Sequence, residues 1–347
     1  MRVGYARAAA ADWVFRYAQN RTGFRGAYLG GSTISLPDDA ELVATSDLDV
    51  LIVAAATCED PPIKTGKVRY RGVLLDIGSV PEQQLRSPEQ VLGSYRLAGS
   101  FRIDRIIADP SGWLHRLQAA VAADFARRHW VRTRCEEAGR IIEERLAGIQ
   151  PGAPFHEQVT RWLFAAGGTA HLPLVAALFN PTVRLRYLAA REVLAAHGLD
   201  EHYRPLLELL GCADLTRQTV GRQLDGLAAT FDAAAAVART PIAFSSDITP
   251  AARHIAIDAS RQLIDRGDHR EAVFWVVASY ARCHAILAVD APDLHRQLAP
   301  FFLAAMADLG IGSPADIARR AGQIHDALPN IRQLAETIMA SNPEIVD

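Results

Sequence analysis

Lysine is almost absent from this 347-residue chain, in which Lys64 and Lys67 are the only two and arginine supplies nearly all of the positive charge. The formal net charge is -2, with no acidic or basic tail. Nucleic acid is therefore not an expected partner, because a template channel needs net positive charge. Together with the many alanines, the excess of arginine is typical of a GC-rich coding background, and we attach no binding role to it.

Paired cysteines and a long apolar segment are also missing. The four cysteines are far apart, which argues against a zinc site or a disulfide framework and indicates reduced thiols. They are Cys58, Cys135, Cys212 and Cys283. Asp12 interrupts the apolar run that a signal peptide would need. The most apolar stretch, Ala272–Tyr280, lies between Arg270 and Arg282 and is too short to cross a bilayer. We therefore expect a cytoplasmic protein with no membrane partner.

The first part of the chain mixes strand and helix patterns. Apolar residues recur at helical spacing near the N-terminus, and short apolar or alternating runs between glycine and proline turns then predict strands. The expected order is helix 3–19, strands 24–29 and 47–54, a hairpin of 67–71 and 73–80, helix 81–97 broken near Pro88, and strand 101–107. The nearly continuous apolar run after Asp49 indicates that strand 47–54 is central in its sheet.

Beyond residue 125 no convincing strand pattern remains. Glycine and proline punctuation divides this part into helices with short connections, as in a helical bundle. The expected helices are 113–148, 155–166, 171–179, 182–196, 201–210, 214–239, 250–266, 269–289, 292–309, 314–326 and 330–340. The prediction is an α+β protein with two domains, a mixed sheet with flanking helices in 1–125 and an all-α bundle in 126–347.

The stretch from residue 27 to residue 53 contains two polar motifs. Gly30-Gly31-Ser32 closes the first strand, and Asp47-Leu48-Asp49 leads into the second. Alternate residues of a strand share a face, so Asp47 and Asp49 point the same way and repel each other unless a cation lies between them. The glycine-serine turn offers backbone N–H groups to an anion. Together the motifs predict a divalent metal and a phosphate at one place.

Asp76 is a third candidate, on a later strand with apolar neighbours. Each motif alone has a simpler explanation, because Asp-x-Asp is usually a solvated strand end and Gly-Gly-Ser is usually a turn. Asp76 is less easily dismissed, since an unpaired buried carboxylate costs several kcal/mol.

Gly30-Gly31-Ser32, Asp47-x-Asp49 and Asp76, in that order, resemble the nucleotidyltransferase superfamily that includes DNA polymerase β. The closest similarity is to small bacterial enzymes such as the aminoglycoside nucleotidyltransferases, which join such a domain to a helical C-terminal domain. The resemblance is specific over residues 24–80 and architectural beyond them. It implies transfer of a nucleoside monophosphate from a nucleoside triphosphate, ATP in the first instance, to an acceptor hydroxyl with release of pyrophosphate.

The resemblance also implies roles for the residues. Asp47 and Asp49 would bridge two Mg²⁺ ions, and Asp76 would complete the acceptor-side ion and help to deprotonate the hydroxyl. Gly31 and Ser32, with Gly30, would hold the triphosphate. The sequence does not identify a general base in the helical domain.

The acceptor is open. Residues 126–347 contain 23 Arg against 25 Asp plus Glu, so they are only slightly acidic. That favours an acceptor less basic than an aminoglycoside, such as another antibiotic or an intermediate of secondary metabolism. Nucleotidylation of a protein, as in toxin–antitoxin systems, and a non-catalytic nucleotide-binding regulatory protein are the alternatives. Similar enzymes sometimes build the site across a homodimer, and the sequence does not decide this.

Three further features stay unassigned. The loop Thr33–Thr45 is longer than is common in the family, and we interpret it as surface decoration rather than as a specificity element. The basic stretches 126–134 and 180–187 could each contact an anion. A solvated helix face is the alternative for 126–134, and an inter-helix salt bridge for 180–187.

Overall fold

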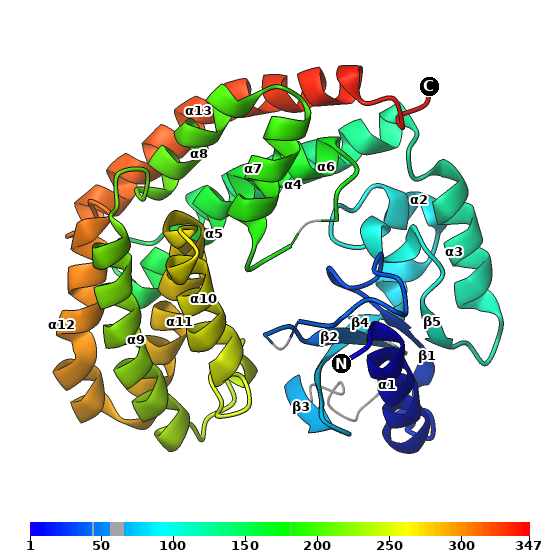
Figure 1. Ribbon diagram of the computed structural model, residues 1–347, viewed down its shortest axis with the longest axis horizontal. Helices are drawn as coiled ribbons and strands as arrows, with labels where there is room; N and C mark the ends of the chain where they lie inside the picture. The colour runs from blue at the N-terminus through cyan, green and yellow to red at the C-terminus, as the bar shows by residue number, and fades with distance from the viewer. Residues whose placement is uncertain (44, 56–65, 181) are drawn as a thin grey trace. The chain divides into compact units, whose positions relative to one another are not determined.

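A computed structural model of the protein describes all residues except 44, 56–65 and 181 (Figure 1). The chain forms two compact units. Unit 1 comprises Met1–Glu137, Leu178–Pro181 and Asn342–Asp347, and unit 2 comprises Ala138–Ala177 and Thr182–Ser341. The predicted boundary after residue 125 falls just beyond helix α3 (Trp113–Asp124), whereas unit 1 continues into helix α4 (Arg128–Ala147).

Unit 1 is built on a mixed sheet of five strands in the order β3-β4-β2-β1-β5. The strands are β1 (Phe24–Leu29), β2 (Leu48–Ala54), β3 (Gly66–Tyr70), β4 (Val73–Pro81) and β5 (Ile106–Ala108). Strand β2 is in the middle, antiparallel to β1 and parallel to β4. The predicted α+β class and the central position of β2 are confirmed.

Helices cover both faces of this sheet. Helix α1 (Val3–Tyr17) packs on one face against Leu48, Val50 and Ile52 of β2. Helices α2 (Pro88–Leu92) and α3 belong to a second core that includes Val53. Because the side chains of β2 alternate between these cores, Asp49 lies on the face away from α1.

Two predicted elements are shorter than expected. The helix expected over 81–97 is a 3₁₀ turn at Glu82–Leu85 followed by α2, which starts at Pro88 with the Ser87 hydroxyl accepting from Gln90 N at 3.3 Å. The strand expected over 101–107 is a 3₁₀ turn ending at Phe101 and then the three-residue β5. In this turn the ring of Phe101 is buried against that of Tyr28, with centroids 4.8 Å apart.

The loop Thr33–Thr45, in its described part, is not surface decoration, and that interpretation was wrong. Its carbonyl groups accept from the first N–H groups of α1, with Ala40 O 2.9 Å from Val3 N and Asp38 O 2.9 Å from Gly4 N. These donors have no partner inside the helix. Ile34 of the loop is buried in the core under α1. The loop therefore caps α1 and anchors the chain between the two polar motifs.

Arg7 of α1 holds this loop from the side. Its Nη2 donates to the carbonyl oxygens of Thr33 (2.8 Å), Ile34 (3.2 Å) and Leu36 (2.8 Å). We expect Arg7→Met to lower the free energy of unfolding by about 2–4 kcal/mol, since several charged hydrogen bonds are lost and their part-buried carbonyl acceptors are left without a donor. Urea denaturation measures this. Arg16→Met, on the exposed face of α1, is the control and should cost less than about 1 kcal/mol. Equal losses in the two variants would contradict the role of Arg7.

Unit 2 consists of helices and their connections, with no strand among its described residues. Its helices are the C-terminal part of α4, α5 (Phe155–Thr169), α6 (His171–Ala176), α7 (Arg186–Ala196), α8 (Tyr203–Leu210), α9 (Arg217–Val237), α10 (Ala259–Asp265), α11 (His269–Asp290), α12 (Pro292–Asp308) and α13 (Pro314–Ser341). The helix expected over 113–148 is two helices, α3 and α4. The two expected on either side of Pro329 are one helix, α13, with that proline inside it.

Helix α11 is the centre of unit 2 and packs against α9, α5 and α12. Among the described helices it alone is long and apolar enough to cross a membrane, because it extends beyond Ala272–Tyr280 at both ends. The sequence-based expectation that this segment is too short for a bilayer applied only to Ala272–Tyr280, and it is wrong for the whole helix. However, 83% of its apolar window is buried, as in the core helix of a globular domain.

Three histidine rings meet beside α11. His284 of α11 lies 5.0 Å from His295 of α12, and His295 lies 6.0 Å from His156 of α5, between ring centroids. His284 is 1% exposed, and neither of its ring nitrogens has a hydrogen-bond partner among the described residues. Burial, followed by repulsion from the other two rings, lowers the pKa of His284 to about 3. The ring is therefore neutral in the folded protein at pH 7.

This burial predicts acid sensitivity. In the unfolded chain His284 has a pKa near 6.5. Between about pH 6.5 and pH 3 the unfolded chain therefore binds more protons than the folded one, and the free energy of unfolding decreases as the pH is lowered. From pH 7 to pH 5 we expect this group to remove about 2 kcal/mol from the free energy of unfolding. Urea denaturation of the wild type and of His284→Leu at both pH values tests this. The variant should lose about 2 kcal/mol less than the wild type, and an identical loss would refute the assignment.

Candidate functional site

The predicted carboxylates lie on neighbouring strands of the sheet. Asp49 of β2 is the register partner of Asp76 of β4, and because the two strands are parallel their side chains share a face. Asp47 comes one residue before β2. The side chains of Asp47 and Asp76 are 24% and 28% exposed. The structure thus brings the three predicted acids together at one place on the sheet, each partly open to solvent.

Lys67 is the partner of these acids that the sequence did not reveal. The two-residue turn Arg71-Gly72, with φ of 48° and 78°, joins β3 to β4 and sets Lys67 opposite Asp76. Lys67 Nζ lies 2.5 Å from Asp47 Oδ2 and 2.5 Å from Asp76 Oδ2, and its side chain is only 5% exposed. No motif marks Lys67 in the sequence, although the hairpin predicted over 67–71 and 73–80 already places it opposite Asp76.

The glycine turn lies directly against the carboxylates. Gly31 has a φ of 72°, in the left-handed region, and a Cβ atom on it would be 1.7 Å from Asp49 Oδ2. Gly30 N donates to the backbone oxygen of Asp49 at 3.0 Å. Ser32 follows on the exposed side of the turn. Only glycine fits at position 31, because any side chain would displace the Asp49 carboxylate.

A second missed residue, Asn180, supports the turn from a distant part of the chain. Its Nδ2 donates to Gly31 O at 2.7 Å, and its side chain fills the space left by Gly99, where a Cβ would be 2.3 Å from Asn180 Oδ1. The helix expected over 182–196 begins only at Arg186, as α7, with Leu185 in the cap position. No local pattern reports a contact between residues 149 positions apart.

The two basic stretches are partly buried in the units' own cores. Arg134 is 2% exposed and donates to the carbonyl oxygens of Leu92 and Phe125. Burial lowers its pKa to about 10. Arg186 is 1% exposed and stacks over Phe274, 3.7 Å from the ring centroid. Neither arginine is part of a solvated helix face.

The carboxylate oxygens around Lys67 are of a kind that suits a hard cation. Carboxylate oxygens are the ligands that Mg²⁺ prefers, and an ammonium already lies between two of the three acids. In the arrangement found, the described residues include no group of three or more His, Cys, Asp or Glu side chains that could hold a metal ion. Binding of Mg²⁺ by Asp47 and Asp76 would therefore require Lys67 to leave its place between them.

Comparisons were made with protein-family models, with curated proteins and with solved structures. None of the three finds a match. The resemblance to the nucleotidyltransferases thus depends on the sequence motifs alone.

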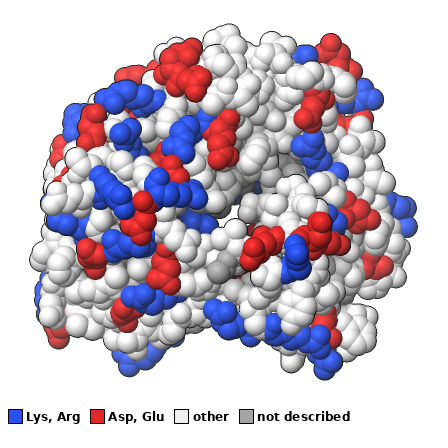
Figure 2. All heavy atoms as spheres, viewed as in Figure 1, with Lys and Arg blue, Asp and Glu red and all other residues white. Residues whose placement is uncertain are grey.

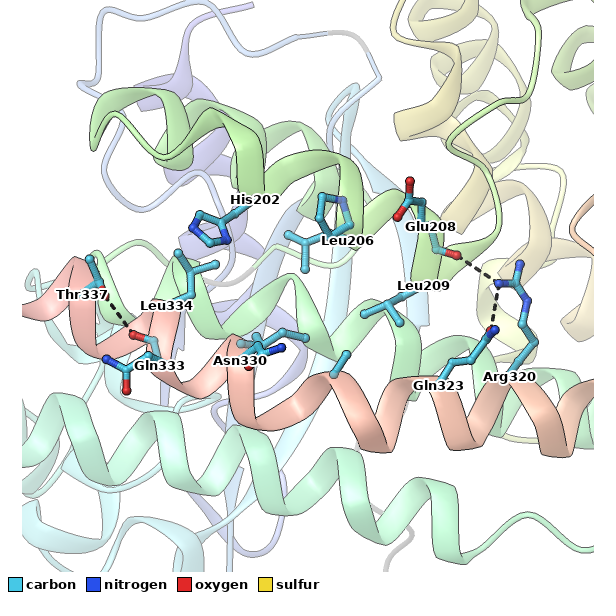
Figure 3. Close-up of a pocket in the computed structure, with 13 residues that line it drawn as sticks. His202, Leu206, Glu208, Leu209, Arg320, Gln323, Asn330, Gln333, Leu334 and Thr337 are labelled. Carbon is cyan, nitrogen blue, oxygen red and sulfur yellow. Dashed lines mark hydrogen bonds between the residues drawn. The ribbon is translucent and has the colours of Figure 1, made fainter.

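A separate pocket of about 650 Å³ lies in unit 2 between α8 and α13 (Figure 3). Leu206, Leu209 and Leu334 contribute apolar walls, and Arg320 borders the pocket while donating to Glu208 O at 3.0 Å. This volume suits a drug-sized molecule. None of the predicted site residues lines the pocket, and we assign it no role in the site.

Surface charge gives no indication of a polyanion partner on the face seen in Figure 2. Acidic and basic side chains are interspersed there rather than gathered by sign. A nucleic-acid channel would need a continuous basic stripe. That the protein does not bind nucleic acid therefore stays a prediction.

Proposed function

We propose that the protein is a nucleotidyltransferase that moves a nucleoside monophosphate, AMP from ATP in the first instance, to a hydroxyl group of a small molecule. The observation that carries the proposal is the contact between the two motifs. Gly31 lies against the Asp49 carboxylate, and Asp76 is in register beside it. A phosphate held by the turn would then be next to the acids that hold its cation.

In this proposal each residue acts on charge. Bound Mg²⁺ would neutralise the phosphate oxygens and bring the acceptor into line with the α-phosphorus. Asp47 and Asp49 would hold the ions, and Asp76 would hold the acceptor-side ion and take part in removing the proton of the hydroxyl. The N–H groups of the turn Gly30-Gly31-Ser32 would hold the triphosphate, where a side chain at position 31 would prevent close approach.

The direct test is pyrophosphate release from ATP and Mg²⁺ in the presence of candidate acceptors. Antibiotics less basic than aminoglycosides and hydroxylated intermediates of secondary metabolism come first, because residues 126–347 are only slightly acidic. Labelled ATP incubated with cell lysate separates two outcomes. Label in small molecules supports the proposal, whereas label in a protein band would replace it by protein nucleotidylation.

One observation favours a second candidate, a nucleotide-binding protein without catalysis. The Lys67 ammonium already neutralises part of the carboxylate charge, which an inert site would need for stability. Equilibrium binding of ATP without turnover in any acceptor or lysate assay would favour this candidate over the enzyme.

A further inference from the structure

The Lys67 ammonium occupies a position that the proposed function does not explain. A carboxylate oxygen from the segment before β2 and another from β4 each lie 2.5 Å from Nζ, and the lysine side chain is 5% exposed. A buried ammonium is costly unless it is paired, and here both contacts are ionic hydrogen bonds. Lys67 is therefore held firmly between Asp47 and Asp76.

The acids in turn need a positive charge beside them. Asp49 and Asp76 are adjacent in register, and Asp47 shares the Lys67 ammonium with Asp76. Three ionised carboxylates at this spacing repel one another unless a cation compensates them. Lys67 supplies that charge through Oδ2 of Asp47 and Oδ2 of Asp76, two of the carboxylates that would hold the metal in the proposed function.

We propose that Lys67 is a built-in counter-ion that competes with divalent cations for Asp47 and Asp76. The inference rests on the proposed nucleotidyltransferase site for the identity of its metal ligands. Lys67 stabilises the carboxylate cluster, and a metal ion must displace the ammonium from at least one carboxylate before it binds. The affinity for a divalent ion is therefore lower than three carboxylates alone would give.

The experiment measures Mn²⁺ binding without nucleotide, from the electron paramagnetic resonance signal of the free ion. It compares the wild type with Lys67→Met, which keeps the length of the side chain and removes its charge, and with Lys67→Arg, which keeps the charge. We expect Lys67→Met to bind Mn²⁺ at least about tenfold more tightly than the wild type. Lys67→Arg should stay within about threefold of it. Equal affinities of Lys67→Met and the wild type would overturn the proposal, as would equal tightening in both variants.

A second measurement covers the case in which Lys67→Met is unstable without metal. Thermal unfolding is followed in EDTA and in Mn²⁺. The proposal expects Lys67→Met to unfold at a lower temperature in EDTA and to gain more from Mn²⁺ than the wild type does. If the variant is unfolded in EDTA, Mn²⁺ should refold it, and failure to refold while Lys67→Arg stays folded would count against the proposal.

These results are separable from a failure of the proposed function, because neither measurement uses ATP or an acceptor. Pyrophosphate release with unchanged Mn²⁺ affinity in Lys67→Met would overturn only the role of Lys67. Tightened Mn²⁺ binding without pyrophosphate release would support the counter-ion and leave the transferase unsupported.

Discussion

Asp49→Asn is expected to reduce pyrophosphate release by roughly a hundredfold or more. The substitution keeps the shape of the side chain but removes one of the charges that hold the cations, and metal-assisted charge neutralisation contributes several kcal/mol to such transition states. The backbone hydrogen bond from Gly30 N to Asp49 O does not involve the side chain and should persist. The fold should therefore survive, which circular dichroism can verify.

Asp39→Asn is a matched control for this variant. Asp39 is an exposed acid of the loop between the two motifs, and it lies outside the carboxylate cluster. Its replacement should leave the rate of pyrophosphate release within about twofold, as for most surface substitutions. If Asp49→Asn keeps wild-type release under conditions where the wild type is active, Asp49 does not hold a catalytic cation.

Gly31→Ala is expected to damage both the site and the stability of unit 1. Alanine at a φ of 72° costs about 1–2 kcal/mol in backbone energy, and its Cβ would be 1.7 Å from Asp49 Oδ2. The carboxylate must then move, and a displacement of about 1 Å at a reacting centre can cost a hundredfold in rate. Urea denaturation and pyrophosphate release measure the two effects on the same preparation.

Gly72→Ala separates these effects. Gly72 has a similar φ of 78°, but an added Cβ would meet nothing within 4 Å. This control should show the backbone cost of about 1–2 kcal/mol and keep its activity. If Gly31→Ala loses no more activity than Gly72→Ala, the contact between the turn and Asp49 has no catalytic importance.

Local patterns were sufficient for the central part of the fold. The apolar run after Asp49 marked β2 as the middle strand, because only a strand covered on both faces is apolar at nearly every position. The apolar residues on either side of Asp76 placed it within β4, and the turn at Gly72 fixed the hairpin. The parallel pairing of β4 with β2, which brings Asp76 beside Asp49, was expected only from the family resemblance.

What the sequence did not reveal depends on contacts between distant segments. Asn180 reaches Gly31 across 149 positions, and the capping of α1 by Ala40 has no signature in either segment. Helix α13 continues through Pro329 although proline usually ends a helix. Leu328 and Ile331, on either side of it, are buried, so packing within unit 2 offsets that local preference.

The burial of Lys67 has a practical consequence for chemical labelling. Because the chain contains only two lysines, an amine-selective acylating reagent has few side chains to modify. The Lys67 side chain is 5% exposed and its ammonium is shared between two carboxylates, so it should acylate slowly while it stays there. A ligand that draws the ammonium away from Asp47 and Asp76 would make it reactive. Mass spectrometry of one peptide would then report the occupancy of the carboxylate cluster without any knowledge of the acceptor.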